Sequence, residues 1–196
     1  MAIEELNKLK DLDFTKQMAF AYLTCERLFT NYIYFSNNFN FGNPDVLREA
    51  IDFLYQNIFD KNPDKNKINL LTKEVEKNTP DTENFSTNFV SSALDACTAV
   101  LESLDFLVDN QFSRIKDISS FATDTVYMYI QYIDKLDFNT DRGFQQKIDN
   151  HPLMQKEVAI QLGIITFLSN SRAFDYGDIQ TLLHLQENNK KSNLGL

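Results

Sequence analysis

The stretch 17–44 constrains the fold most, because its only charged residues are the adjacent pair Glu26 and Arg27. Its apolar residues occupy more than one face at helical spacing, which is typical of a helix in the middle of a bundle. A charge in such surroundings must be paired and hydrogen-bonded, or folding is strongly disfavoured. The stretch therefore predicts a central helix over about 13–38, with a paired Glu26 and Arg27 inside the molecule.

The rest of the chain also favours helices. Only 5 glycines and 4 prolines occur in 196 residues, too few for the many turns of a β fold. Apolar residues recur at three- and four-residue spacing, which predicts further helices over 3–12, 44–58, 69–77, 86–109, 112–136, 152–171 and 176–188. We predict one all-α domain over 1–196, a compact helical bundle of six to eight helices, with 192–196 as a flexible tail.

Charge and composition limit the partners and the location. The net charge of −9 disfavours binding to phosphate backbones and anionic membranes, so we expect no nucleic acid and no membrane partner. The longest strongly apolar uncharged run, 158–171, is too short to cross a bilayer. Cys25 and Cys97 are interpreted as small buried hydrophobes, and the N-terminus has no signal-peptide pattern. These features predict a soluble, cytoplasmic protein, and a homo-oligomer stays open as a partner.

The sequence lacks the motifs of the common catalytic and metal sites. No glutamate has histidine three residues later, as di-iron bundles require, and the only histidines are His151 and His184. His151 precedes Pro152 and is interpreted as the start of a helix. Glycine-rich phosphate loops, nucleophile elbows and EF-hand loops are also missing. We therefore expect no cofactor and assign no metal ligands, although an all-carboxylate cation site stays open.

Several short motifs resemble one family. They are Cys25-Glu26-Arg27-Leu28, Asn31-Tyr32, Phe41-Gly42, Leu47-Arg48 with Asp52, and Ala93-Leu94-Asp95-Ala96-Cys97, with looser matches at Pro152, Glu157, Gln161 and the ending Ser192-Asn193-Leu194-Gly195. In this order they are similar to the YjaG-like family of bacterial proteins, which carry a domain of unknown function. The resemblance implies a single all-helical domain and implies no activity.

A candidate polar site follows from the isolated charges and these motifs. Its members are Glu26, Arg27, Asn31, Asp52 and Asp95. In the first interpretation Glu26, Arg27, Asn31 and Asp95 form an internal network that fixes helix register in a non-enzymatic scaffold or protein-interaction module.

The second interpretation is a small-molecule binding protein or a carboxylate-based enzyme. Arg27 would anchor an anionic ligand, and the three carboxylates would act as acid–base or cation-binding groups. This interpretation requires the groups to converge on an open cavity. The absence of any catalytic motif favours the first interpretation.

Overall fold

The computed structural model describes residues 7–60, 62–186 and 192–195. Within these residues every regular element is helical, which confirms the prediction of an all-α bundle. The elements are, in chain order, the 3-10 helix η1 (Asn7–Asp11), α2 (Phe14–Phe39), α3 (Pro44–Gln56), α4 (Lys65–Lys77), the 3-10 helix η2 (Thr82–Asn84), α5 (Phe89–Asp109), α6 (Phe112–Asp134), α7 (Phe144–Asp149), α8 (Pro152–Asn170) and α9 (Tyr176–Gln186).

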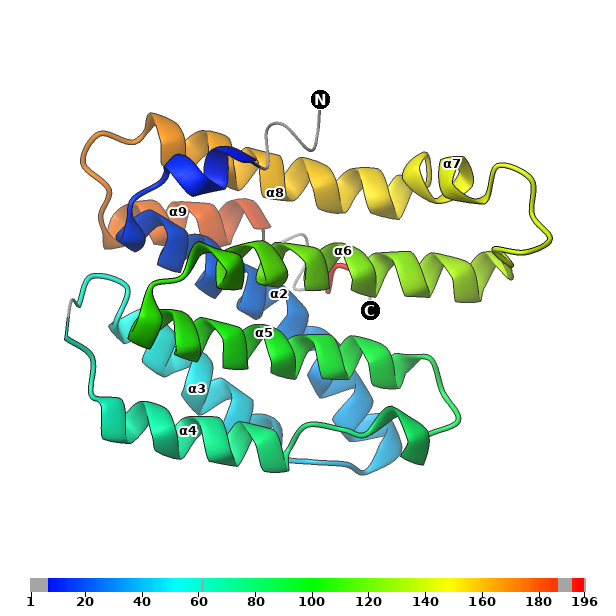
Figure 1. The fold of residues 1–196 in the computed structure, drawn as a ribbon, viewed down its shortest axis with the longest axis horizontal. Coiled ribbons are helices and arrows are strands. Elements are labelled where there is room, and N and C mark those ends of the chain that lie inside the picture. Colours follow the sequence, from blue (N-terminus) through cyan, green and yellow to red (C-terminus); the bar gives the residue numbers. More distant parts are fainter. Residues whose placement is uncertain (1–6, 61, 187–191, 196) are drawn as a thin grey trace.

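Helix α2 is the central helix of the bundle. It contacts α3, α5, α6, α8 and α9, and Figure 1 shows it running through the middle, between α8 and α9 on one side and α3 and α4 on the other. Every residue from Gln17 to Cys25 is buried, so side chains on all faces of this part of the helix are covered. The uncharged stretch therefore folds as its composition predicts, because only a helix surrounded by others can bury apolar residues all round.

Local capping signals set the helix bounds. The Asp13 side chain accepts a hydrogen bond from the backbone N–H of Lys16 and starts α2. Asn43 caps α3 in the same way, with Pro44 in its first turn. At the start of α8, His151 Nδ1 accepts from the backbone N–H of Leu153, which confirms the interpretation of this histidine as a helix-start residue.

The structure adds one α-helix that the sequence pattern did not predict. Helix α7 has only six residues, and only Phe144 and Ile148 are buried in it. One pair of apolar residues four apart is too short a pattern to distinguish a helix from a loop. The predicted helical residues 3–6 and 187–188 lie outside the described part of the chain.

The segment 192–195 differs from the predicted flexible tail. Ser192, Asn193 and Leu194 are buried, and Leu194 joins a small apolar cluster between α6, α7 and α8. A short polar segment near a chain terminus is mobile only when it does not pack against the rest of the protein. Whether it packs depends on residues far away in the sequence, which the local sequence pattern does not show. The last residue of the predicted tail, Leu196, lies outside the described residues.

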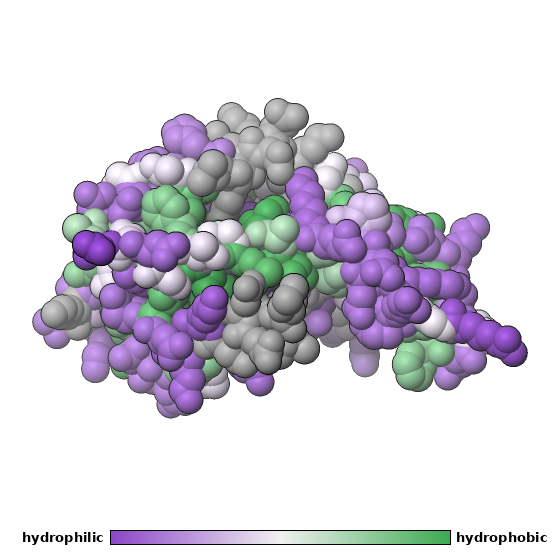
Figure 2. Space-filling view, turned by 90° about the horizontal axis from the view of Figure 1, so that it is seen from above, coloured by the Kyte–Doolittle hydropathy of each residue, from purple (hydrophilic) through white to green (hydrophobic). Residues whose placement is uncertain are grey.

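The molecule is elongated in the direction of α6 and α8. The α6–α7 connection forms one end (Figure 1), and this end is mainly hydrophilic on the face seen in Figure 2. Apolar surface on that face gathers nearer the middle of the molecule. Within the described residues, no helix combines the length and apolar character needed to cross a membrane.

Candidate functional site

Arg27 pairs with Glu157, which lies 130 residues away on α8. Arg27 Nη2 donates a hydrogen bond of 2.7 Å to Glu157 Oε1, and the two side chains are 6% and 0% exposed. Gln161, one turn further along α8, donates to the same oxygen at 2.9 Å. The Ser119 hydroxyl of α6 donates to Gln161 Oε1 at 2.6 Å. These four buried side chains, which we call the Arg27–Glu157 network, join α2, α8 and α6.

The Arg27–Glu157 network leaves some polar atoms unused. Arg27 Nε, Arg27 Nη1 and Glu157 Oε2 are buried and have no hydrogen-bond partner in the structure's described ranges. Burying a charged group without all its hydrogen bonds disfavours folding, so the attraction within the pair is largely offset by desolvation. Removing one partner, however, leaves a buried charge without a counter-charge. The network therefore specifies how α2 meets α8 more than it adds stability.

Asn31, one turn after Arg27, binds the C-terminal segment. Its Nδ2 donates to Asn193 Oδ1 at 2.9 Å, and Asn193 Nδ2 donates to the backbone oxygen of Ala122 on α6 at 3.1 Å. These two bonds hold the end of the chain against α2 and α6. The amide nitrogen of Asn31 is thus used within the fold, whereas its Oδ1 is buried without a hydrogen-bond partner among the described residues.

Glu26 pairs with Arg48 of α3 rather than with Arg27. Arg48 donates from Nη1 to Glu26 Oε2 at 2.9 Å and from Nη2 to Glu26 Oε1 at 2.8 Å. Its Nη2 also lies 2.8 Å from Asp52 Oδ1, and its guanidinium lies over the ring of Phe29. Adjacent residues of a helix do not face each other, so Glu26 and Arg27 bind partners on different sides of α2.

Asp95 lies apart from these groups, between α5 and α6. The Thr125 hydroxyl donates to Asp95 Oδ2 at 2.6 Å. Burial raises the pKa of Asp95 to about 6, the Thr125 hydrogen bond opposes this rise, and the nearby Asp124 adds to it. The structure therefore brings Glu26 and Asp52 together through Arg48, places Arg27 and Asn31 one turn apart with separate partners, and leaves Asp95 elsewhere.

The raised pKa of Asp95 predicts a pH dependence of stability. Because this pKa lies above the ordinary value of 3.8, the folded protein binds the proton more tightly than the unfolded chain between about pH 4 and 6. The contribution of Asp95 to the free energy of unfolding should fall by on the order of 2 kcal/mol as the pH rises through this window, then stay level. We expect Asp95→Asn to be more stable than wild type at pH 7 and close to it at pH 4.

Urea unfolding at several pH values tests this expectation, with the exposed Asp117→Asn as the matched control. The stability difference between Asp95→Asn and wild type should change with pH, whereas that for Asp117→Asn should not. A difference for Asp95→Asn that is constant from pH 4 to pH 7 would contradict the assignment.

Sequence reasoning did not assign Glu157 to the candidate site, although a usable signal exists. Glu157 is the last charge before the uncharged run 158–171, and Arg27 is the only positive charge in the stretch 17–44. Two charges of opposite sign that border or lie in uncharged helical stretches are natural partners. Gln161 and Asn193 carry no such signal, because neutral amides are common on helix surfaces and in tails.

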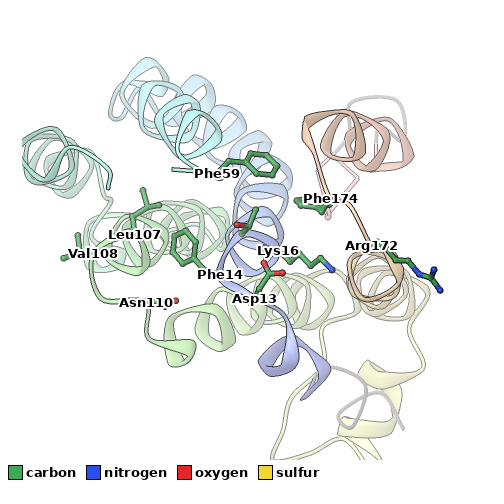
Figure 3. Close-up of a pocket in the computed structure, with 10 residues that line it drawn as sticks. Asp13, Phe14, Lys16, Phe59, Leu107, Val108, Asn110, Arg172 and Phe174 are labelled. Atoms are coloured by element: carbon green, nitrogen blue, oxygen red, sulfur yellow. Dashed lines mark hydrogen bonds between the residues drawn. The ribbon is translucent and has the colours of Figure 1, made fainter. Parts of the chain in front are cut away.

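Two of the hollows on the surface of the described structure are lined by charged side chains. One, of about 680 Å³, lies at the end of the bundle where α2 begins (Figure 3). The other, of about 390 Å³, lies over α3 and is lined by Arg48 and Asp52 among others. Glu26, Arg27 and Asp95 line neither. No group of three or more histidine, cysteine, aspartate or glutamate side chains within the described ranges is arranged to hold a metal ion.

The bundle and its internally paired charges define an all-helical domain. The family model for a protein of unknown function (DUF416) matches residues 4–196, so the chain belongs to the DUF416 family.

Relatives agree with this membership. The chain is 23% identical over 193 residues to the uncharacterised protein YjaG of Escherichia coli K12, covering 96% of this chain and 94% of YjaG. YjaG of Salmonella typhimurium LT2 is also 23% identical. The crystal structure of a DUF416 family protein from Shewanella baltica superposes with a TM-score of 0.88 at 27% identity, over 97% of each chain. These names assign no reaction.

Proposed function

We propose that the protein is a non-enzymatic helical scaffold or interaction module. The observation that supports this most is that the candidate polar groups bind internal partners in separate places. An enzyme needs an acid, a base or a nucleophile to converge on one accessible point. Free buried cysteines and a net charge of −9 favour a cytoplasmic protein that does not bind nucleic acid.

The alternative function, anionic-ligand binding or carboxylate chemistry by Glu26, Arg27, Asp52 and Asp95, has less support. Arg27 is only 7% exposed, so an external anion has no direct path to it. Asp52 does line a hollow, but its carboxylate is already paired with Arg48.

The interaction surface that we favour lies on the C-terminal half of α6 and the loop after it. Four large apolar side chains are exposed there: Met128, Tyr132, Ile133 and Phe138, the last at 74%. Met128 and Tyr132 are four residues apart and so share one face of α6. We call these four residues the α6 surface.

A second copy of the chain fits the α6 surface best. Charges of both signs lie close to it in the sequence, with Lys135 and Arg142 near Asp134 and Asp137. Two copies related by a twofold axis can then place charges of opposite sign opposite each other. On a mainly acidic surface, the same arrangement would place negative charges against negative charges. We therefore propose a homodimer formed through the α6 surface.

Sedimentation over a range of protein concentrations tests the homodimer. We expect wild type to be dimeric and Met128→Ser/Tyr132→Ser to raise the dimer dissociation constant about tenfold or more. Leu70→Ser is the matched control, because Leu70 is also exposed but lies on α4, and it should leave the dimer unchanged. A wild-type protein that stays monomeric at about 100 μM, a concentration at which weak complexes form, would overturn the proposal.

A further inference from the structure

The hollow at the end of the bundle has the size of a small-ligand site. Its volume of about 680 Å³ lies within the range of known ligand pockets, roughly 300–1,000 Å³. Four separate parts of the chain meet around it: the start of α2, the end of α5, the α3–α4 loop and the α8–α9 loop (Figure 3). Because these segments are far apart in the sequence, the hollow exists only when the protein is folded.

One side of this hollow is apolar and aromatic. Phe14 is held by stacking on Phe106, with ring centroids 5.2 Å apart, and Phe59 stacks with Phe174 at 5.8 Å. Val108, on α5, lines the hollow and is 49% exposed. Rings fixed by stacking lose little freedom when a ligand packs on them, so this side suits an apolar or aromatic body.

The other side carries excess positive charge. Lys16 and Arg172 line the hollow against a single carboxylate, that of Asp13, in a chain whose net charge is −9. Asp13 is already used as the cap of α2, while Lys16 Nζ is held by the backbone oxygen of Ser171 at 2.8 Å. Arg172 extends outward from the α8–α9 loop (Figure 3).

We propose that this hollow binds a small amphipathic anion, with an aromatic or branched apolar body and one carboxylate or sulfonate group. The apolar body packs among Phe14, Phe59 and Val108, and the anionic group faces Lys16, with the outward-pointing Arg172 at the rim of the hollow. This site goes beyond the scaffold function and uses none of its residues. It also lies apart from the α6 surface, so either proposal can fail without the other.

Two fluorescent dyes with the same kind of aromatic body test the site on the full-length protein. Anilinonaphthalene sulfonate carries an anionic group, whereas phenylnaphthylamine is neutral. We expect the sulfonate dye to bind with one site per chain and about tenfold more tightly than the neutral dye. Its affinity should also fall as salt is added, because exposed charges are screened.

Paired variants locate the binding. Val108→Trp fills the hollow from an exposed position and should weaken the sulfonate dye about tenfold, while Leu70→Trp on α4 should not. Arg172→Gln should weaken it about threefold, and Arg142→Gln, in the exposed loop before α7, should not. Unchanged thermal melts confirm that the variants fold. Unchanged affinity in Val108→Trp, or equal affinity for both dyes, would overturn the proposal.

Discussion

Glu157→Gln is expected to lower the free energy of unfolding by about 3–5 kcal/mol. The substitution keeps the shape of the side chain but removes the one negative charge that pairs with Arg27 among the described residues, and the Arg27 side chain is only 6% exposed. A buried positive charge without a counter-charge has lost its hydration and gains nothing in return. For a domain whose total stability is about 5–15 kcal/mol, this loss is a large fraction.

Urea unfolding measures this loss, and Glu26→Gln is the matched control. Glu26 also pairs with an arginine, but its side chain is 21% exposed and that of Arg48 is 32% exposed. Partly hydrated pairs contribute about 1 kcal/mol or less, so the control should lose far less stability. Equal losses in the two variants would mean that burial does not distinguish the two ion pairs.

Gly42→Ala is expected to lower the free energy of unfolding by about 3 kcal/mol. Gly42 has φ +66°, a conformation that side chains disfavour, and a Cβ there would lie 2.1 Å from Tyr32 Oη. That hydroxyl donates to the backbone oxygen of Asn78 at 2.7 Å. The added methyl group must displace Tyr32, so the strain of the backbone adds to the loss of this hydrogen bond.

Gly143→Ala separates these two effects. Gly143 has nearly the same φ, +68°, but the nearest atom to its added Cβ would be 3.9 Å away. The free energy of unfolding of this variant should therefore fall by only about 1 kcal/mol, the cost of placing a side chain at positive φ. If thermal or urea unfolding gives the same loss of stability for both alanine variants, the contact with Tyr32 does not contribute to the effect of Gly42→Ala.

The fold could largely be predicted from the sequence because its signals are local. Asn43 and Pro44 mark the start of α3 within a few residues, and the uncharged stretch of α2 requires neighbours on every side. The short α7 and the docked segment 192–195 depend on contacts with distant helices, so they lie beyond such signals. Both belong to the same small apolar cluster around Val126.

The candidate site could be predicted only in part, for a related reason. An isolated charge in an apolar helix shows that a partner must exist, and Arg27 and Asp95 do have partners. It does not show which residue that partner is, because Glu157 is 130 residues from Arg27 in the chain. The adjacent Glu26 is close in sequence but points away from Arg27 on the helix.

A double-mutant cycle on Arg27 and Glu157 tests most directly whether this ion pair couples α2 to α8 as a structural element. The variants are Arg27→Met, Glu157→Met and the two combined, each measured by urea unfolding. We predict that the double variant is more stable than either single variant, because Met at both positions leaves no buried charge. Losses that simply add in the double variant would contradict a coupled pair, and with it the structural role of the network.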